Sequence, residues 1–240
     1  MNHCPFTTVV MPLHSSQRLS PTAILGLWHL TETLAELWPS LPQAEAYQAR
    51  MPATADTTRQ AQWLAGRVLI HRLLKELLPQ PTADLLVNND ATGRPWLAGD
   101  ATGLTVSLSH SGIWVAAMLT QGGRAGVDVE IIRDKAQRLA SKFLAPDEWA
   151  TAQAATHATP EAEAHTHYTL LWSAKETLYK LAAKRGIIFK KQLLLSAFAP
   201  QAAGEIPATL VLDDNKTRHF ICYCQPAPGY VLTYCHEPAA

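Results

Sequence analysis

The sequence predicts an α+β protein, because helical and strand-like patterns occupy separate stretches of the chain. Apolar residues recur at helical spacing before residue 80 and again over 134–184, whereas alternating or continuous apolar runs fill 104–132 and 189–235. Helices and strands that are segregated in this way are typical of α+β folds. With 240 residues, 48% of them hydrophobic, the chain can bury one large core or two smaller ones.

Three helices are predicted in the first third of the chain. The dipeptide Ser20-Pro21 resembles an N-cap followed by a first-turn proline, and helical periodicity then runs to Trp38. A short polar helix is predicted over 44–50. Segment 56–79 carries the clearest helical pattern, with an apolar side and a proline at its end.

The middle of the chain predicts a β-meander. Residues 85–103 are rich in turn-forming residues and are expected to form turns. Three strand-like runs follow, at 104–112, 113–119 and 125–132. The pair Gly122-Gly123 is the predicted joint between two subdomains, 1–122 and 123–240, which share no detectable repeat.

Helices and then strands return in the last hundred residues. The predicted helices are 134–143, 146–154 and 165–184, and the predicted strands are 189–198, 208–213, 218–224 and 229–235. Residues 156–165 are expected to form a mobile polar loop, and we expect His157, His165 and His167 to be solvated there.

Composition and charge narrow the possible partners and the possible location of the protein. The formal net charge is zero and the pI is about 7.2, which argues against nucleic-acid binding by bulk charge. We find neither a signal-peptide pattern nor a run of apolar residues long enough to span a membrane. Four cysteines in a chain of this length do not predict a disulfide framework. We therefore expect a cytoplasmic protein with no membrane or nucleic-acid partner.

Two acids lie on one face of the strand that contains "GVDVE", residues 126–130. Because side chains two apart in a strand point the same way, Asp128 and Glu130 project together. Two carboxylates this close repel each other unless a cation lies between them, and a hard divalent cation fulfils that need. A plain solvated strand face is the alternative.

The helix that contains "WSAKETLYK", residues 172–180, carries Glu176 and Lys180 one turn apart, opposite its apolar stripe. They are either an ordinary helix ion pair or an acid for a metal site with a lysine for phosphate. Lys175 lies near the edge of the apolar stripe. We expect its stem to lie along the core while its ammonium reaches out.

Further candidate residues for binding phosphate occur earlier in the chain. Ser109 and His110 end a strand, where a hydroxyl and an imidazole can bind phosphate, although a lone histidine is often structural. Arg94 lies in a Gly-Arg-Pro turn, and arginine offers the best donor fork for phosphate. Arg50 and Arg67 lie on or beside helices, where solvation is the alternative.

Together these segments resemble the 4'-phosphopantetheinyl transferases, in the larger monomeric type with two pseudo-symmetric halves. The resemblance rests on "GVDVE" and "WSAKETLYK" and is supported by "WLAGRVLIHRLL", "GRPWL", "SLSHS" and "FLAPDEWA". It covers about residues 50–198. It implies two α/β subdomains, each a small antiparallel sheet packed with helices, with the active site at their interface.

The resemblance also implies roles for the matching residues. Asp128, Glu130 and Glu176 resemble Mg²⁺ ligands, and Lys180 resembles the lysine beside the transferring phosphate. Glu176 and Lys180 are therefore the catalytic candidates. The implied contacts to coenzyme A are Arg50, Arg67, Arg94, Ser109, His110, Lys175 and Lys180.

The implied reaction moves the 4'-phosphopantetheine arm of coenzyme A to a serine of an apo acyl or peptidyl carrier protein. Fatty-acid, polyketide, siderophore and peptide-synthetase carriers all remain open as acceptors. Carrier proteins are typically acidic helical domains. The segment "AAKRGIIFKK", residues 182–191, is either a basic and apolar rim for such a partner or a plain solvated lead-in to a strand.

Two other functions fit part of the same pattern. Another Mg²⁺-dependent pyrophosphate-cleaving enzyme would share the acids but not the Ser-His and Gly-Arg-Pro elements. A non-catalytic module that binds a carrier protein or coenzyme A would keep the pattern without the chemistry. Product analysis separates the first from a transferase, because hydrolysis needs no protein acceptor.

Overall fold

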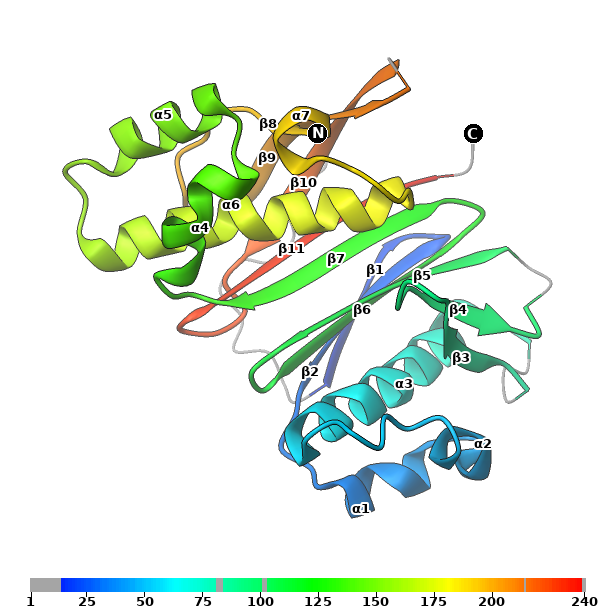
Figure 1. Cartoon of the computed structure of the whole chain (residues 1–240). Coiled ribbons are helices and arrows are strands. Elements are labelled where there is room, and N and C mark those ends of the chain that lie inside the picture. Colours follow the sequence, from blue (N-terminus) through cyan, green and yellow to red (C-terminus); the bar gives the residue numbers. More distant parts are fainter. Residues whose placement is uncertain (1–13, 81–83, 101–102, 214, 239–240) are drawn as a thin grey trace. The chain divides into compact units, whose positions relative to one another are not determined.

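A computed structural model describes residues 14–80, 84–100, 103–213 and 215–238 (Figure 1). Contacts between these residues divide the chain into two compact units. The N-terminal unit comprises residues 14–125 and 236–238, and the C-terminal unit comprises residues 126–235. Each unit has its own sheet and its own helices, which confirms the predicted α+β class.

The N-terminal unit is built on a four-stranded antiparallel sheet with the order β1-β2-β6-β5. Leu69 and Leu73 of the long helix α3 belong to the same buried cluster as Ile24 of the sheet. Its strands are β1 (His14–Ser20), β2 (Ala23–His29), β5 (Leu104–Ser111) and β6 (Trp114–Gln121), and a separate hairpin is β3 (Leu86–Asn89) and β4 (Pro95–Ala98). Its helices are α1 (Leu34–Leu37), the 3₁₀ turn η1 (Trp38–Ser40), α2 (Ala44–Gln48) and α3 (Thr57–Leu77).

The predicted helix from Ser20-Pro21 to Trp38 is wrong. Pro21 lies in the turn between β1 and β2, and only the short helix α1 follows. β2 is a central strand, and six of its seven residues are buried. A continuous apolar run of this length has no period that separates a buried strand from a buried helix, so tertiary pairing decides.

The expectation of turns alone over 85–103 is incomplete. The hairpin of β3 and β4 pairs four residues on each side, and Asn89 faces Pro95 at its turn. Asp90 accepts hydrogen bonds from the backbone of Thr92 and Arg94, which fixes that turn. By contrast, the structure confirms the helices over 44–50 and 56–79 and the three strands of the meander.

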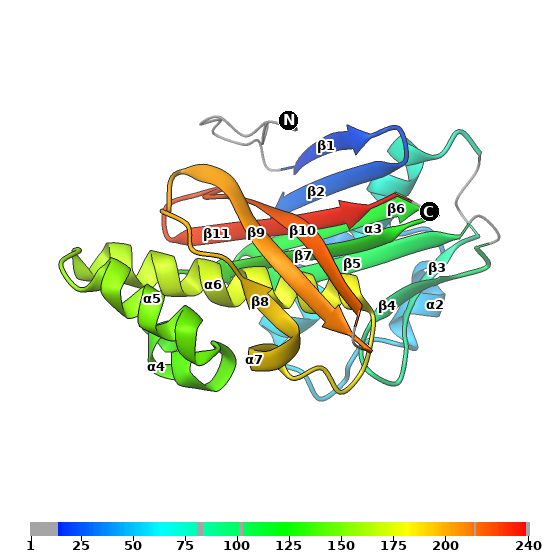
Figure 2. The ribbon, with the colours of Figure 1, turned by 90° about the horizontal axis from the view of Figure 1, so that it is seen from above.

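The C-terminal unit is built on a five-stranded sheet with the order β7-β11-β10-β9-β8, against which the 22-residue helix α6 packs (Figure 2). Helices α4 and α5 contact α6 and lie outside it. The strands are β7 (Arg124–Ile131), β8 (Leu193–Leu195), β9 (Ala203–Leu212), β10 (Asn215–Cys224) and β11 (Tyr230–Glu237). The helices are α4 (Lys135–Phe143), α5 (Pro146–Thr156), α6 (Glu161–Ala182) and α7 (Phe189–Gln192).

Two segments of this unit differ from the sequence prediction. The polar loop predicted over 156–165 shrinks to 157–160, because Pro160 is the N-cap of α6 and Glu161 and Glu163 lie in its first turn. Acidic residues in a first turn are favoured by the helix dipole. Residues 189–198 begin as the helical turn α7, and only three of them form a strand.

Two neighbouring strands, β7 and β11, cross the division between the units. Inside the N-terminal unit, Arg124 Nε donates a hydrogen bond to Glu237 Oε2 at 2.7 Å. The N-terminal unit is therefore assembled from two parts of the sequence that lie more than a hundred residues apart. None of the helices in the described part of the chain is long and apolar enough to cross a membrane.

Gly126 allows β7 to lie directly against α6. A Cβ atom at this position would meet the carbonyl oxygen of Thr177 at 2.1 Å and the backbone nitrogen of Leu181 at 3.1 Å. No side chain therefore fits between this part of the strand and the helix. The contact brings Asp128, two residues further along β7, to the face of α6 that carries Lys180.

Replacing Gly126 with alanine is expected to lower the free energy of unfolding by about 1–3 kcal/mol, because strand and helix must separate to admit the methyl group. Urea denaturation followed by circular dichroism measures this change. An unchanged midpoint would contradict the close packing of β7 on α6.

Candidate functional site

The structure brings Asp128 of β7 and Lys180 of α6 together. Lys180 Nζ donates to Asp128 Oδ1 at 2.9 Å and to the carbonyl oxygen of Val127 at 2.8 Å. Asp128 is only 4% exposed, so the ammonium compensates a carboxylate that burial would otherwise penalise. Val127 and Val129 are buried, as the alternation of the strand predicts.

The other two predicted acids lie close to this pair. Glu130 accepts a hydrogen bond from Trp172 Nε1 at 3.1 Å. Burial raises the pKa of Glu176 to about 7; the charges of Asp128 and Glu130 also raise it, and Lys180 opposes them. Three carboxylates and one lysine therefore share a single electrostatic environment where β7 meets α6.

The chemistry and the placement of the three acids decide whether they can bind a divalent cation. Three carboxylates supply the oxygen ligands that Mg²⁺ prefers. In the described part of the chain, however, no three His, Cys, Asp or Glu side chains are already arranged around one point. Lys180 lies against Asp128, and Trp172 binds Glu130. The donors fit Mg²⁺, and the ligand assignment stays a prediction.

A pocket of about 170 Å³ opens beside one of these acids, Glu130, in the C-terminal unit. Glu130, Trp172 and Thr169 line it together with apolar residues of β7 and α4, and Arg133 and Lys135 add positive charge. The hydroxyl of Thr169 is buried and has no hydrogen-bond partner among the described residues. The pocket can therefore take a ligand that has both an apolar part and a polar or anionic part.

Lys175 lies in the core, and the prediction that its ammonium reaches out is wrong. Its side chain is fully buried, and burial lowers the pKa of its ammonium. Nζ donates to Glu148 Oε2 at 2.6 Å and to the carbonyl oxygens of Leu193 at 2.6 Å and Phe189 at 3.4 Å. These partners occupy all three donors of an ammonium group.

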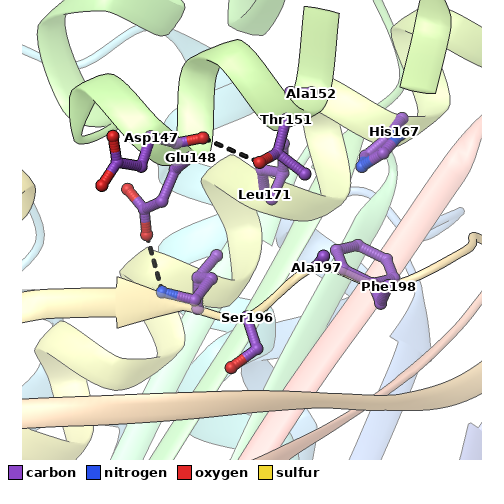
Figure 3. A pocket seen from close by; sticks show the side chains of 10 residues that line it. Asp147, Glu148, Thr151, Ala152, His167, Leu171, Ser196, Ala197 and Phe198 are labelled. Carbon is purple, nitrogen blue, oxygen red and sulfur yellow. Dashed lines mark hydrogen bonds between the residues drawn. The ribbon is translucent and has the colours of Figure 1, made fainter. Parts of the chain in front are cut away.

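Glu148, the partner of Lys175, connects three segments of the C-terminal unit through hydrogen bonds. Its Oε1 accepts from the backbone N–H of Leu195 at 2.6 Å (Figure 3). Its Oε2 accepts from the backbone N–H of Ala145. One carboxylate thus ties the start of α5, the strand β8 and Lys175 of α6 to one another. Glu148 also lines a pocket of about 150 Å³, to which none of the predicted site residues contributes.

The expectation of a solvated histidine loop fails for His167. This residue lies on α6, is 6% exposed and meets Phe198 edge to face, with 5.2 Å between ring centroids. Burial lowers the pKa of its imidazole, which keeps the ring neutral at neutral pH. It lines the pocket of Figure 3 beside Phe198.

Arg67 is a core residue of the N-terminal unit rather than an exposed contact. Its side chain is 2% exposed, and its guanidinium lies 3.7 Å from the centre of the Trp63 ring. It donates to the carbonyl oxygen of Trp63 and to Asn89 Oδ1. Burial lowers the pKa of Arg67 to about 10, which still leaves it charged at neutral pH.

Four further predicted contacts to coenzyme A also lie in the N-terminal unit. Arg94 lines an open hollow of about 360 Å³ together with Trp96, which is 48% exposed. Ser109 and His110 lie near the end of β5, half-buried and exposed, respectively. Arg50 is exposed and donates to the carbonyl oxygen of Ala46.

Two residues of this region carry roles that the sequence did not assign. Trp172 binds Glu130 and stacks on Phe189, with 5.9 Å between ring centroids. Glu148 compensates Lys175. Both stand inside segments that carry the family resemblance, "WSAKETLYK" and "FLAPDEWA", but spacing alone does not show their partners.

Comparison with known proteins matches the region that holds the acids. Residues 124–235 match the model of the 4'-phosphopantetheinyl transferase superfamily. The chain is 33% identical over 124 residues to 4'-phosphopantetheinyl transferase AcpT of Salmonella typhi. The matched region covers 51% of this chain and 58% of that protein. The chain is 31% identical over 124 residues to AcpT of Escherichia coli strain K12, covering 51% and 57%.

A more distant relative is the phosphopantetheinyl transferase of Thraustochytrium sp., which is 28% identical over 127 residues and covers 49% of this chain and 44% of that protein. The chain thus spans between about two fifths and three fifths of the length of these relatives. The family match includes Asp128, Glu130, Glu176 and Lys180.

Proposed function

We propose that the chain, whose residues 124–235 match the model of the 4'-phosphopantetheinyl transferase superfamily, transfers the 4'-phosphopantetheine arm of coenzyme A to a serine of an apo carrier protein. Adenosine 3',5'-bisphosphate is the second product. The acceptor is an acyl or peptidyl carrier protein, and we expect the enzyme to act as a monomer.

One observation carries the proposal. Asp128, Glu130 and Glu176 are close enough to shift the pKa of Glu176, and Lys180 lies against Asp128. This arrangement combines an acid of elevated pKa with a lysine that can neutralise phosphate. A solvated strand face and an isolated helix ion pair, the two simpler interpretations, do not account for a half-buried acid whose pKa is raised by burial and by two neighbouring carboxylates.

In the proposed reaction, the serine oxygen attacks the phosphorus that carries the pantetheine arm, and the bond from this phosphorus to the bridging oxygen breaks. Glu176 accepts the proton of the serine hydroxyl, which is a weak nucleophile without a base. Lys180 compensates the negative charge that develops on the departing phosphate. Asp128, Glu130 and Glu176 would hold Mg²⁺, which when bound neutralises a pyrophosphate.

The proposal assigns the nucleotide end of coenzyme A to the N-terminal unit. Arg94, Ser109 and His110 are half-buried or exposed and can reach a ligand, as can Arg50. The hollow beside Arg94 adds the exposed ring of Trp96 to this surface. The proposed contacts leave out Arg67 and Lys175, because their charged groups are buried against partners of their own.

Mass spectrometry tests the proposal directly. The protein is incubated with coenzyme A, Mg²⁺ and either a purified apo acyl carrier protein or an apo peptidyl carrier protein. We expect one carrier to gain the mass of a phosphopantetheine group and to lose this gain when EDTA is added. Cleavage of coenzyme A with both carriers unmodified would instead identify a hydrolase, and no reaction at all would favour a binding module.

A further inference from the structure

An exposed basic patch adjoins the candidate site in the C-terminal unit. It consists of Arg185, Ile188, Lys190 and Lys191. The side chain of Ile188 is 52% exposed among the three exposed cations. In the part of the chain that the structure describes, no ion pair joins these cations to an acid, whereas the neighbouring Lys184 is paired with Asp213.

The backbone of α7, which carries two lysines of the basic patch, is held in place by hydrogen bonds to the core. The helix α7 has only four residues and would not be stable alone. Lys175 Nζ donates to the carbonyl oxygens of Phe189 and Leu193, which lie at the two ends of α7. The side chain of Gln192 accepts from the backbone N–H of Ile188 at 2.7 Å, which closes the turn.

A row of aromatic rings connects this patch to the candidate acids. Phe189 of α7 lies against Tyr179 and Trp172 of α6, with 5.5 Å and 5.9 Å between ring centroids. Trp172 in turn binds Glu130. Phe189, which stands between two residues of the patch in the sequence, is therefore two side-chain contacts away from a candidate metal ligand, within one unit. Figure 2 draws α7 at the margin of this unit, beside α4.

We propose that the basic patch docks the acidic carrier protein and guides its serine toward Glu176. This inference rests on the proposed function. The net charge of the chain is zero, so attraction of an acidic partner must come from a local patch. Complementary charge raises the rate of encounter, and an apolar residue among the charges, here Ile188, provides the contact that excludes water.

Charge reversal at two positions tests the docking surface. In the full chain, Lys190→Glu with Lys191→Glu is expected to raise KM for the apo acyl or peptidyl carrier protein at least about tenfold, with little change in kcat. KM for coenzyme A is expected to stay within about twofold, and the effect should shrink at high salt because the attraction is screened. Ile188→Ala should raise the carrier KM without changing its salt dependence.

The matched control is Lys216→Glu with Arg218→Glu, which makes the same charge change on the exposed face of β10 in the same unit. If both double variants raise the carrier KM equally, the effect comes from net charge and the docking inference is overturned. If Lys190→Glu with Lys191→Glu raises KM for coenzyme A and not KM for the carrier protein, the patch binds a phosphate of coenzyme A and the docking inference is overturned. An unchanged carrier KM would also overturn the docking inference.

Failure of the proposed function has a different signature. If the wild-type protein modifies neither carrier, the transferase assignment fails before any variant is compared. If the wild-type protein modifies a carrier and Lys190→Glu with Lys191→Glu does so with the same KM, only the docking surface is wrong.

Discussion

Replacing Lys175 with methionine is expected to lower the free energy of unfolding by about 3–5 kcal/mol, because it leaves the carboxylate of Glu148 inside the protein without its cation. The Lys175 side chain is fully buried, and that of Glu148 is 9% exposed. The ammonium also binds the carbonyl oxygens of Leu193 and Phe189, which lose a donor in the variant. Thermal and urea denaturation measure the loss.

The double variant Lys175→Met with Glu148→Gln separates charge from packing. If the uncompensated carboxylate causes most of the loss, neutralising it should recover a substantial part, because breaking a buried pair costs more than replacing both partners. A neutral glutamine can still accept from the N–H of Leu195. A double variant no more stable than Lys175→Met would assign the loss to the carbonyl contacts of α7 instead.

Replacing Glu176 with glutamine is expected to lower kcat for transfer by about 10²–10⁴-fold, the usual contribution of a general base. The amide keeps the size of the side chain but cannot accept the serine proton. Glu163→Gln is a matched control, because Glu163 is exposed in the first turn of the same helix. Transfer by Glu176→Gln at the rate of the wild-type protein would remove Glu176 from the mechanism.

The pKa of Glu176 adds a pH signature to the same variant. In the folded protein this pKa is about 7, above its ordinary value of 4.5. Between these two values the unfolded chain has lost the proton that the folded chain retains, so rising pH lowers the stability of the folded state. Without divalent cations, the melting temperature of the wild-type protein should therefore fall more between pH 5 and pH 8 than that of Glu176→Gln.

Mg²⁺ gives the complementary measurement. If the three acids bind the cation, Mg²⁺ should raise the melting temperature of the wild-type protein at pH 8, where Glu176 is ionised, more than at pH 5. The variant Glu176→Gln should respond less. A Mg²⁺ response that is identical in both proteins would place the cation elsewhere.

The sequence predicted those elements whose pattern has a clear period. Helix α3 has an N-cap, Asp56, whose side chain accepts from the backbone N–H of Arg59, and an apolar side of several turns. The strand β2 could not be identified, because its residues are buried on both faces and its identity is fixed by pairing with β1 and β6. Local sequence does not contain that pairing.

The same limit applies to the candidate site. Alternation along β7 correctly placed Asp128 and Glu130 on one face, and the helical wheel placed Glu176 and Lys180 on one side of α6. The approach of strand to helix depends on Gly126, and its proximity to Thr177 is a tertiary property. Sequence alone predicts exposed cations at Lys175 and Arg67, because one sequence does not reveal their buried partners, Glu148 and Asn89.

The crossing of β7 and β11 between the units has a consequence for the order of folding during synthesis. The N-terminal unit includes residues 236–238, and Glu237 is bonded there to Arg124. A ribosome has therefore to deliver the whole C-terminal unit before the N-terminal unit has all its contacts. Contacts between residues so far apart in the sequence form slowly. The N-terminal unit therefore stays incomplete until the C-terminal unit has been synthesised.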